Sequence, residues 1–174
     1  ISIFFKLKLN RSKINKNAAN IVLSSSLIWL DDATVLYKIN THTAAQMSKK
    51  PITPKGPTIQ ESLGKVAPSV TYQDLIKSPY DEYAFEYLAT AQLVKNNAGV
   101  ETKIGAPAII SSIDLSPDKK YFLTRTINKP FSYLVTVYGF ATTVNVTDLN
   151  GKIVKTIADL ASAETTPSGY DNVQ

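Results

Sequence analysis

The residues of this sequence that could act as acids, bases or nucleophiles are few and scattered. The chain has one histidine, His42, and no cysteine, so it offers one imidazole base and no thiolate for catalysis or metal binding. A catalytic histidine needs a nucleophile and an orienting carboxylate beside it, and the polar sequence around His42 indicates neither. We therefore predict a histidine on a surface loop, no catalytic residue in this chain, no metal site and no cofactor.

Adjacent carboxylates at Asp31 and Asp32 could serve acid–base chemistry or bind a cation. They follow the apolar run 21–30 and precede the β-branched run 34–37. A tight turn between two strands explains them more simply, because aspartate side chains accept hydrogen bonds from the backbone of such turns. We favour the turn. The apolar alternation beside it places Trp29 in the core rather than on a stacking surface.

The nucleophile elbow of a serine hydrolase is not found in this sequence. Its motif, Gly-x-Ser-x-Gly, sets a serine on a sharp turn between a strand and a helix. The nearest candidate, Ser168-Gly169, lacks the glycine two residues before the serine. If the whole protein is a serine hydrolase, its nucleophile is expected outside these 174 residues.

The formal charge of +5 is unevenly distributed along the chain. Residues 1–55 carry nine Lys and Arg against two Asp, a net charge of +7, whereas residues 56–174 have a net charge of −2. Nucleic-acid binding needs clustered basic residues with stacking aromatic residues, but these lysines are spread between apolar positions. No apolar run approaches the roughly 18 residues of a membrane helix. We therefore expect neither a nucleic acid nor a membrane as partner.

Two similar segments, 86 residues apart, predict paired strands. Residues 25–36 and 111–122 each contain an apolar run, a short acidic turn and a second apolar run. The second copy has the fuller turn, in which Pro117 and Asp118 suit the central positions of a type I turn. Each segment therefore reads as strand, turn, strand.

A further pair of strands follows each of these segments. Residues 90–104 contain two apolar runs around an Asn- and Gly-containing turn, and residues 143–157 contain two runs joined by the hairpin signal Asn150-Gly151. A repeated unit of four strands is typical of β-propeller blades. We therefore predict an all-β chain, a partial β-propeller of about two four-stranded antiparallel blades with a small helical insertion.

The insertion explains why the repeat spacing exceeds the roughly 40–50 residues of one blade. Residues 41–70, rich in Pro, Lys, Thr and Ser, predict a long loop, and a short helical turn is expected at 71–76. A helix then begins with Ser78 as N-cap, Pro79 at the first helical position and Asp81 in the first turn. Its apolar stripe, which we interpret as a packing face, consists of Tyr80, Tyr83, Ala84, Tyr87 and Leu88.

Several longer strings, in this order, resemble one family of peptidases. The insertion contains Gly56-Pro-Thr-Ile-Gln-Glu-Ser-Leu-Gly64 and Ser78-Pro-Tyr-Asp-Glu82, and the second unit contains Leu115-Ser-Pro-Asp118 and Lys129-Pro-Phe-Ser-Tyr-Leu-Val135. They are similar to the propeller of glutamyl endopeptidase-like members of the prolyl oligopeptidase family, and the resemblance covers about residues 21–174.

The resemblance implies a division of the chain into four parts. They are a poorly matched strand and loop at 1–20, a blade at 21–105 with its insertion at about 41–88, the next blade at 106–160, and the start of a following blade at 161–174. We accordingly expect the chain to be a fragment of a longer protein.

In that family a propeller covers a C-terminal α/β-hydrolase domain that carries a Ser-Asp-His triad. The resemblance therefore implies that this chain filters access of peptides to a serine peptidase, and that its partners are the peptide substrate and the hydrolase domain of the same protein. It allows a periplasmic or secreted bacterial protein or a plastid protein. A propeller without a hydrolase, acting as a binding or scaffolding module, is the alternative.

The connection after the second strand of the second unit supplies the candidate peptide-binding residues, Arg125, Lys129, Tyr133 and Tyr138. In the functional interpretation, they line the channel between propeller and hydrolase and contact the peptide. In the alternative interpretation, the two tyrosines cover the surface of the blade, and Arg125 and Lys129 are solvated. Where the family has a histidine and two arginines, this chain has Asn128, Lys129 and Gly139. The bidentate fork of arginine is lost there, which weakens the expectation of cleavage after acidic residues.

Overall fold

The computed structural model describes residues 19–24, 27–51 and 75–165. Most of the strand and loop expected at 1–20, most of the helical turn expected at 71–76 and the Ser168-Gly169 pair lie outside these ranges. The long loop expected over residues 41–70 is described only as far as Pro51.

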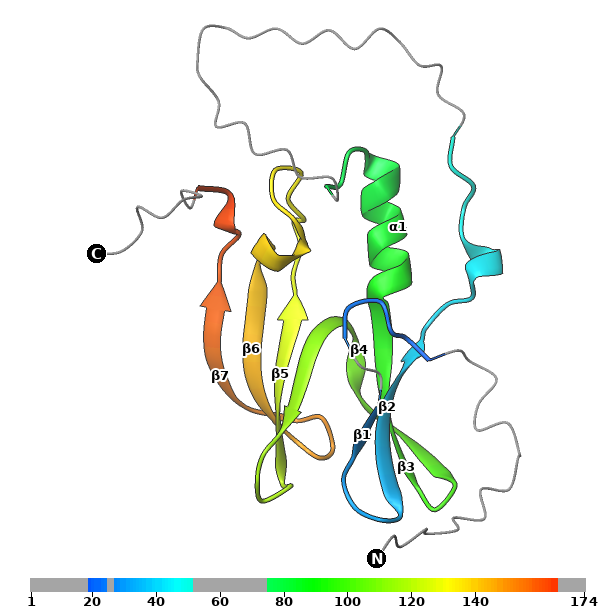
Figure 1. Ribbon diagram of the computed structural model, residues 1–174, viewed down its shortest axis with the longest axis vertical. Helices are drawn as coiled ribbons and strands as arrows, with labels where there is room; N and C mark the ends of the chain where they lie inside the picture. The colour runs from blue at the N-terminus through cyan, green and yellow to red at the C-terminus, as the bar shows by residue number, and fades with distance from the viewer. Residues whose placement is uncertain (1–18, 25–26, 52–74, 166–174) are drawn as a thin grey trace, which may run out of the picture.

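An antiparallel sheet of seven strands in chain order dominates the described ranges (Figure 1). Each strand pairs with the next along the chain, because most of the connections are short hairpins. The strands are β1 (Leu27–Trp29), β2 (Thr34–Asn40), β3 (Thr90–Asn97), β4 (Val100–Leu115), β5 (Tyr121–Ile127), β6 (Thr142–Asp148) and β7 (Ile153–Leu160). The other elements are helix α1 (Pro79–Ala89) and the 3-10 turns η1 (Ala44–Gln46), η2 (Val137–Gly139) and η3 (Ala163–Thr165).

Strand β4 is shared between two halves of the sheet. Its residues 100–109 pair with β3, and its residues 109–115 pair with β5. Irregular register in both pairings accompanies a bend in this long strand, and Gly105 adopts a left-handed φ of +61°. The seven-stranded sheet thus has two four-stranded halves, β1–β4 and β4–β7, and β4 belongs to both. The predicted class, all-β and consistent with a partial propeller, is confirmed, whereas the blade boundaries stay a prediction.

The acidic turns form as predicted, by hydrogen bonds to backbone amides. The Asp31 carboxylate accepts from the amides of Ala33 at 2.8 Å and Thr34 at 2.7 Å, which holds the β1–β2 turn. In the β4–β5 turn, the Lys119 amide donates to the Ser116 carbonyl at 2.8 Å. The hydrogen bond from Ala33 is the main reason that the pKa of Asp31 lies below its usual range.

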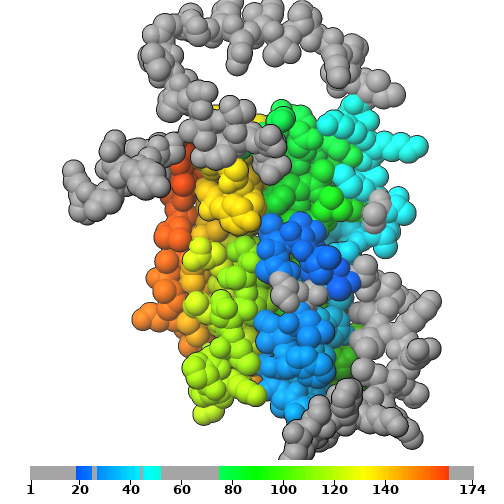
Figure 2. Space-filling model, viewed as in Figure 1, coloured from blue at the N-terminus to red at the C-terminus, as the bar shows by residue number. Residues whose placement is uncertain are grey.

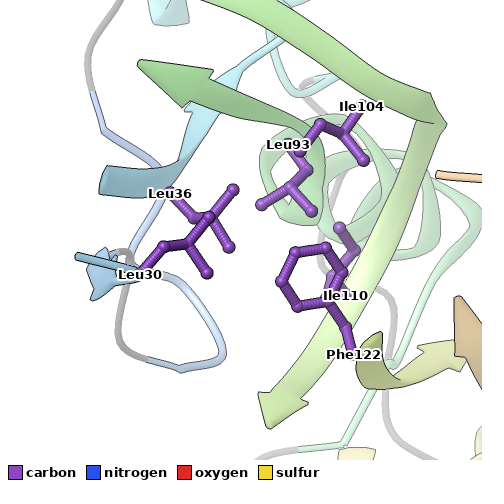
Figure 3. Close-up of a cluster of buried hydrophobic side chains, with 6 residues drawn as sticks. All are labelled: Leu30, Leu36, Leu93, Ile104, Ile110 and Phe122. Carbon is purple, nitrogen blue, oxygen red and sulfur yellow. The ribbon is translucent and has the colours of Figure 1, made fainter. Parts of the chain in front are cut away.

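A buried apolar cluster joins the two halves of the sheet. Its side chains gather from β2, β3, β4, β5 and the β1–β2 turn, as Figure 3 shows, and they are Leu30, Leu36, Leu93, Ile104, Ile110 and Phe122. Ile28 packs against this cluster from β1. Because side chains alternate along a strand, Trp29 points away from the cluster and is 53% exposed. The prediction that Trp29 lies in the core is therefore wrong.

Helix α1 begins as its sequence predicts. The Ser78 hydroxyl accepts a hydrogen bond from the Asp81 amide at 3.2 Å, and Pro79 is the first helical residue. The tyrosine stripe does pack, but against the loop that follows β2: Tyr80 donates to the Ser48 carbonyl at 2.9 Å, and Tyr87 donates to the Thr43 carbonyl at 3.0 Å. Leu88, predicted in that stripe, is instead exposed.

The helices of the described ranges are short, and α1 has 11 residues. None of them is long and apolar enough to cross a membrane.

Candidate functional site

The connection between β5 and β6, residues 128–141, lies at the same end of the sheet as α1 (Figure 1). Phe131 and Phe140 fix its two ends to the core, each only 5% exposed and with ring centroids 5.7 Å apart. Phe85 of α1 meets both rings edge-on, with centroids at 5.0 Å and 5.7 Å. Figure 2 shows the connection in yellow lying against the green helix. The helix and the connection therefore share one core.

Two of the four candidate residues, Lys129 and Tyr133, are turned toward α1. The Lys129 ammonium forms an ion pair with the Glu86 carboxylate, and the Tyr133 hydroxyl donates to the Glu82 carboxylate at 2.9 Å. This hydrogen bond raises the pKa of Tyr133 above its ordinary value, since ionisation would set two negative charges together. Both polar heads are thus engaged by acidic residues of the helix.

The other two candidates, Arg125 and Tyr138, line a cleft of about 370 Å³. Arg125 lies on β5 and points to the opposite face from Phe122, three residues away. It is exposed, and in the described ranges no acidic side chain forms an ion pair with it. Tyr138 is 96% exposed. The remaining walls are formed by Val22, Leu23, Ser111, Ser112, Ile127, Val137 and Thr142.

This cleft is lined by one arginine, the serines Ser111 and Ser112, Thr142, Tyr138 and apolar side chains. A guanidinium offers paired N–H donors that match a carboxylate in geometry and charge. Apolar walls beside it suit the stem of an acidic side chain. The cleft can therefore bind a carboxylate, but among its walls there is no pair of groups that would cleave a bond.

Gly139 lies in the tight turn η2. Its amide donates to the Thr136 carbonyl at 2.8 Å. A Cβ atom at this position would lie 2.9 Å from Cγ2 of Val135, closer than such atoms approach. A larger residue would therefore require Val135 to move.

The structure gives neither a catalytic environment for His42 nor, in the described ranges, a metal site. His42 is exposed on the loop after β2, as predicted, and its ring stacks on Tyr87 with centroids 4.6 Å apart. Within the part of the chain that the structure describes, no three His, Cys, Asp or Glu side chains lie close enough to hold a metal ion.

Sequence reasoning missed Lys38, a buried residue that supports the cleft. It is 1% exposed, and its ammonium donates to the Ser24 hydroxyl at 2.8 Å and lies 3.5 Å from the Ile110 carbonyl. Burial lowers the pKa of Lys38. Because Val22 and Leu23 precede Ser24 and form part of the cleft, Lys38 fixes one of its walls. The available signal was its position on the same face of β2 as Leu36, two residues earlier.

Asn20 holds the other end of the segment 20–24, which contains Val22, Leu23 and Ser24. Its side-chain amide donates to the Leu88 carbonyl of α1 at 2.9 Å, and its side-chain oxygen accepts from the Val22 amide at 3.3 Å. With only 2% of its surface exposed, Asn20 is one of the most buried polar residues described. The cleft is therefore built from β4, β5, the start of β6, the 128–141 connection and residues 22–23, which lie in a segment that Lys38 and Asn20 hold in place.

The fold and the cleft define an all-β protein, a curled sheet consistent with part of a propeller, with one exposed arginine in a cleft. Comparison with known proteins finds two similar plant proteins. The chain is 33% identical over 163 residues to the probable chloroplastic glutamyl endopeptidase of Arabidopsis thaliana, which covers 91% of this chain and 17% of that protein. It is 35% identical over 151 residues to the corresponding protein of Oryza sativa subsp. japonica, covering 86% of this chain and 16% of that protein.

These relatives confirm the resemblance to glutamyl endopeptidase-like proteins: the chain is homologous to one segment of them. It spans about a sixth of the length of the curated relatives it matches. No protein-family model and no solved structure matches the chain.

Proposed function

We propose that this chain is the access-filtering propeller segment of a serine peptidase of the prolyl oligopeptidase family, and that Arg125 receives an acidic side chain of the peptide. The names of the relatives and the curled sheet of two four-stranded halves support this proposal. According to this proposal, the chain forms part of the wall and the entrance of the peptide-binding cavity. The nucleophile and its base belong to a hydrolase domain elsewhere in the whole protein.

The availability of Arg125 is the observation that carries the proposal. Lys129 is neutralised by Glu86, whereas Arg125 points into the cleft and pairs with no acidic side chain of the described residues. A peptide carboxylate entering this cleft would gain two parallel charge-assisted hydrogen bonds from the guanidinium. The tyrosine hydroxyl at position 138 offers a further donor at the rim.

The test uses the full-length protein that contains this chain and a set of peptides differing only in Glu, Gln, Asp or Pro before the scissile bond. We expect Arg125→Gln to raise KM for the Glu peptide roughly tenfold, as loss of a hydrogen bond to a charged group does, with kcat little changed. KM for the Gln peptide should stay the same. Lys103→Gln, which removes an exposed cation from β4 outside the cleft, is the matched control.

Equal KM values for the Glu peptide in Arg125→Gln and in the control would contradict the role of Arg125. If the unsubstituted full-length protein binds the peptides but hydrolyses none of them, the peptidase assignment is contradicted and the non-enzymatic propeller is favoured. The reading frame beyond Gln174 gives an independent check: the peptidase requires a downstream Gly-x-Ser-x-Gly followed by an Asp and a His.

A further inference from the structure

We infer that helix α1 positions the peptide cleft, with Glu82, Phe85 and Glu86 as positioning residues. This inference rests on the proposed function and changes the roles of two candidate residues within it. Lys129 and Tyr133 serve the helix contact, so the carboxylate of the peptide is left to Arg125.

The residues of α1 that contact the connection lie on one face of the helix. Glu82, Phe85, Glu86 and Ala89 are spaced i, i+3, i+4 and i+7, which aligns their side chains. Phe85 packs into the aromatic core and Ala89, 2% exposed, belongs to the same cluster. The helix is therefore held by apolar packing together with the polar contacts of Glu82 and Glu86.

The apolar core behind the connection is also the back of the cleft. Ile127 is a buried member of this core, and Leu23 and Val137 pack against it. The same three residues line the cleft that contains Arg125. Interiors of proteins are close-packed and transmit small displacements. A shift of Phe85 in its pocket therefore moves the cleft wall, although α1 itself contributes no residue to that wall.

The charges of α1 also shape what the cleft attracts. Glu86 neutralises Lys129, and Glu82 holds the hydroxyl of Tyr133. An acidic peptide approaching this end of the sheet thus meets, at α1, the Glu82 carboxylate and the net-neutral Glu86–Lys129 pair. At Arg125 it meets a guanidinium that no acidic side chain of the described residues neutralises. Repulsion from Glu82 and attraction to Arg125 direct the carboxylate to a single place.

Exchanging the charges of Glu86 and Lys129 in the full-length protein tests whether Lys129 positions the connection or contacts the peptide directly. We expect Glu86→Lys and Lys129→Glu each to raise KM for the Glu peptide roughly fivefold by replacing an ion pair with like charges, with kcat unchanged within twofold. The double variant restores the pair with opposite polarity and should return KM to within about twofold of the original. If Lys129 contacted the peptide carboxylate, KM would stay high in the double variant, and the inference would be overturned.

Hydrogen–deuterium exchange provides a readout that does not depend on peptidase activity. The amides of residues 131–140 should exchange faster in each single variant and return to the original rate in the double variant. Tyr133→Phe, which removes only the hydroxyl that contacts Glu82 and keeps the aromatic ring, should accelerate exchange in the same residues. Unchanged exchange in all of these variants would overturn the inference.

The two proposals fail in distinguishable ways. A normal KM in Arg125→Gln would contradict the proposed function, whatever the exchange data show. A raised KM in Arg125→Gln combined with no rescue in the double variant would contradict the positioning role of α1 alone.

Discussion

Two turn glycines, Gly99 and Gly151, offer a direct test of how the two halves of the sheet meet. Gly99 lies in the β3–β4 turn with φ +96°, and Gly151 lies in the β6–β7 turn with φ +88°. Their surroundings differ. A Cβ atom at Gly99 would have no other atom within 4 Å, whereas at Gly151 it would lie 2.3 Å from the amide nitrogen of Gly105, at the bend of β4.

The cost of an alanine at each position depends on these surroundings. A left-handed φ costs an L-residue roughly 1–2 kcal/mol at either site. At Gly151 the clash is with backbone, so the β6–β7 turn or the bend of β4 must move, and overpacking of this kind costs about 1–3 kcal/mol more. We therefore expect Gly99→Ala to lower the free energy of unfolding by about 1–2 kcal/mol and Gly151→Ala by about 2–5 kcal/mol.

The comparison is made in the longest soluble form of the protein that includes these residues. Urea titration with pulse proteolysis, followed by mass spectrometry of peptides from residues 90–160, measures the stability of this sheet alone. Equal destabilisation by the two substitutions would mean that the β6–β7 turn does not pack against the bend at Gly105. That result would refute the inferred contact between the two halves.

Two further predictions concern the buried lysine and the strand edges. Because folding lowers the pKa of Lys38, the unfolded chain binds more protons than the folded chain between the lowered pKa and 10.5, so stability should increase with pH over that interval. Lys38→Met should flatten this dependence in urea titrations at pH 7–10.5, and an unchanged slope would contradict the burial of the ammonium. The isolated 174-residue chain should dimerise or aggregate, because β7 is an edge strand of the described sheet and exposes Ile153, Val154, Ile157 and Leu160. A monodisperse monomer in light scattering, with a sharp thermal transition, would contradict this expectation.

The strands and turns could be predicted from the sequence because their signals are local. The side chains of Asp31 and Asp148 accept hydrogen bonds from backbone amides two residues further on, at 2.8 Å in both cases. Ser78 and Pro79 fix the start of α1 in the same local manner. No such local signal existed for Trp29, because the face of β1 that is buried depends on where the folded sheet gathers its apolar cluster.

The contacts of α1 could be predicted from the sequence only in part. The tyrosine stripe was visible as a run of apolar residues, and it packs on the preceding loop. The face toward the 128–141 connection contains Glu82 and Glu86, which hydropathy assigns to solvent. Their partners, Tyr133 and Lys129, are 51 and 43 residues away in the chain. Only the folded arrangement brings these side chains together.

The four candidate residues of the site were close in sequence but separate in the fold. Arg125 and Tyr138 share the cleft, whereas Lys129 and Tyr133 contact α1. The sequence offered no basis for this division, because the 128–141 connection is held by aromatic packing against α1 rather than by strand pairing. Lys38 was overlooked for a related reason, since lysines in strands usually face solvent.

The most direct test of the central claim is a cryo-electron microscopy structure of the full-length protein with an uncleaved peptide that carries Glu before the scissile bond. The proposed function predicts the two four-stranded halves as adjacent blades of one propeller, with the Glu carboxylate of the peptide within hydrogen-bond distance of the Arg125 guanidinium. A peptide bound elsewhere, or a cleft that faces away from the hydrolase domain, would contradict it.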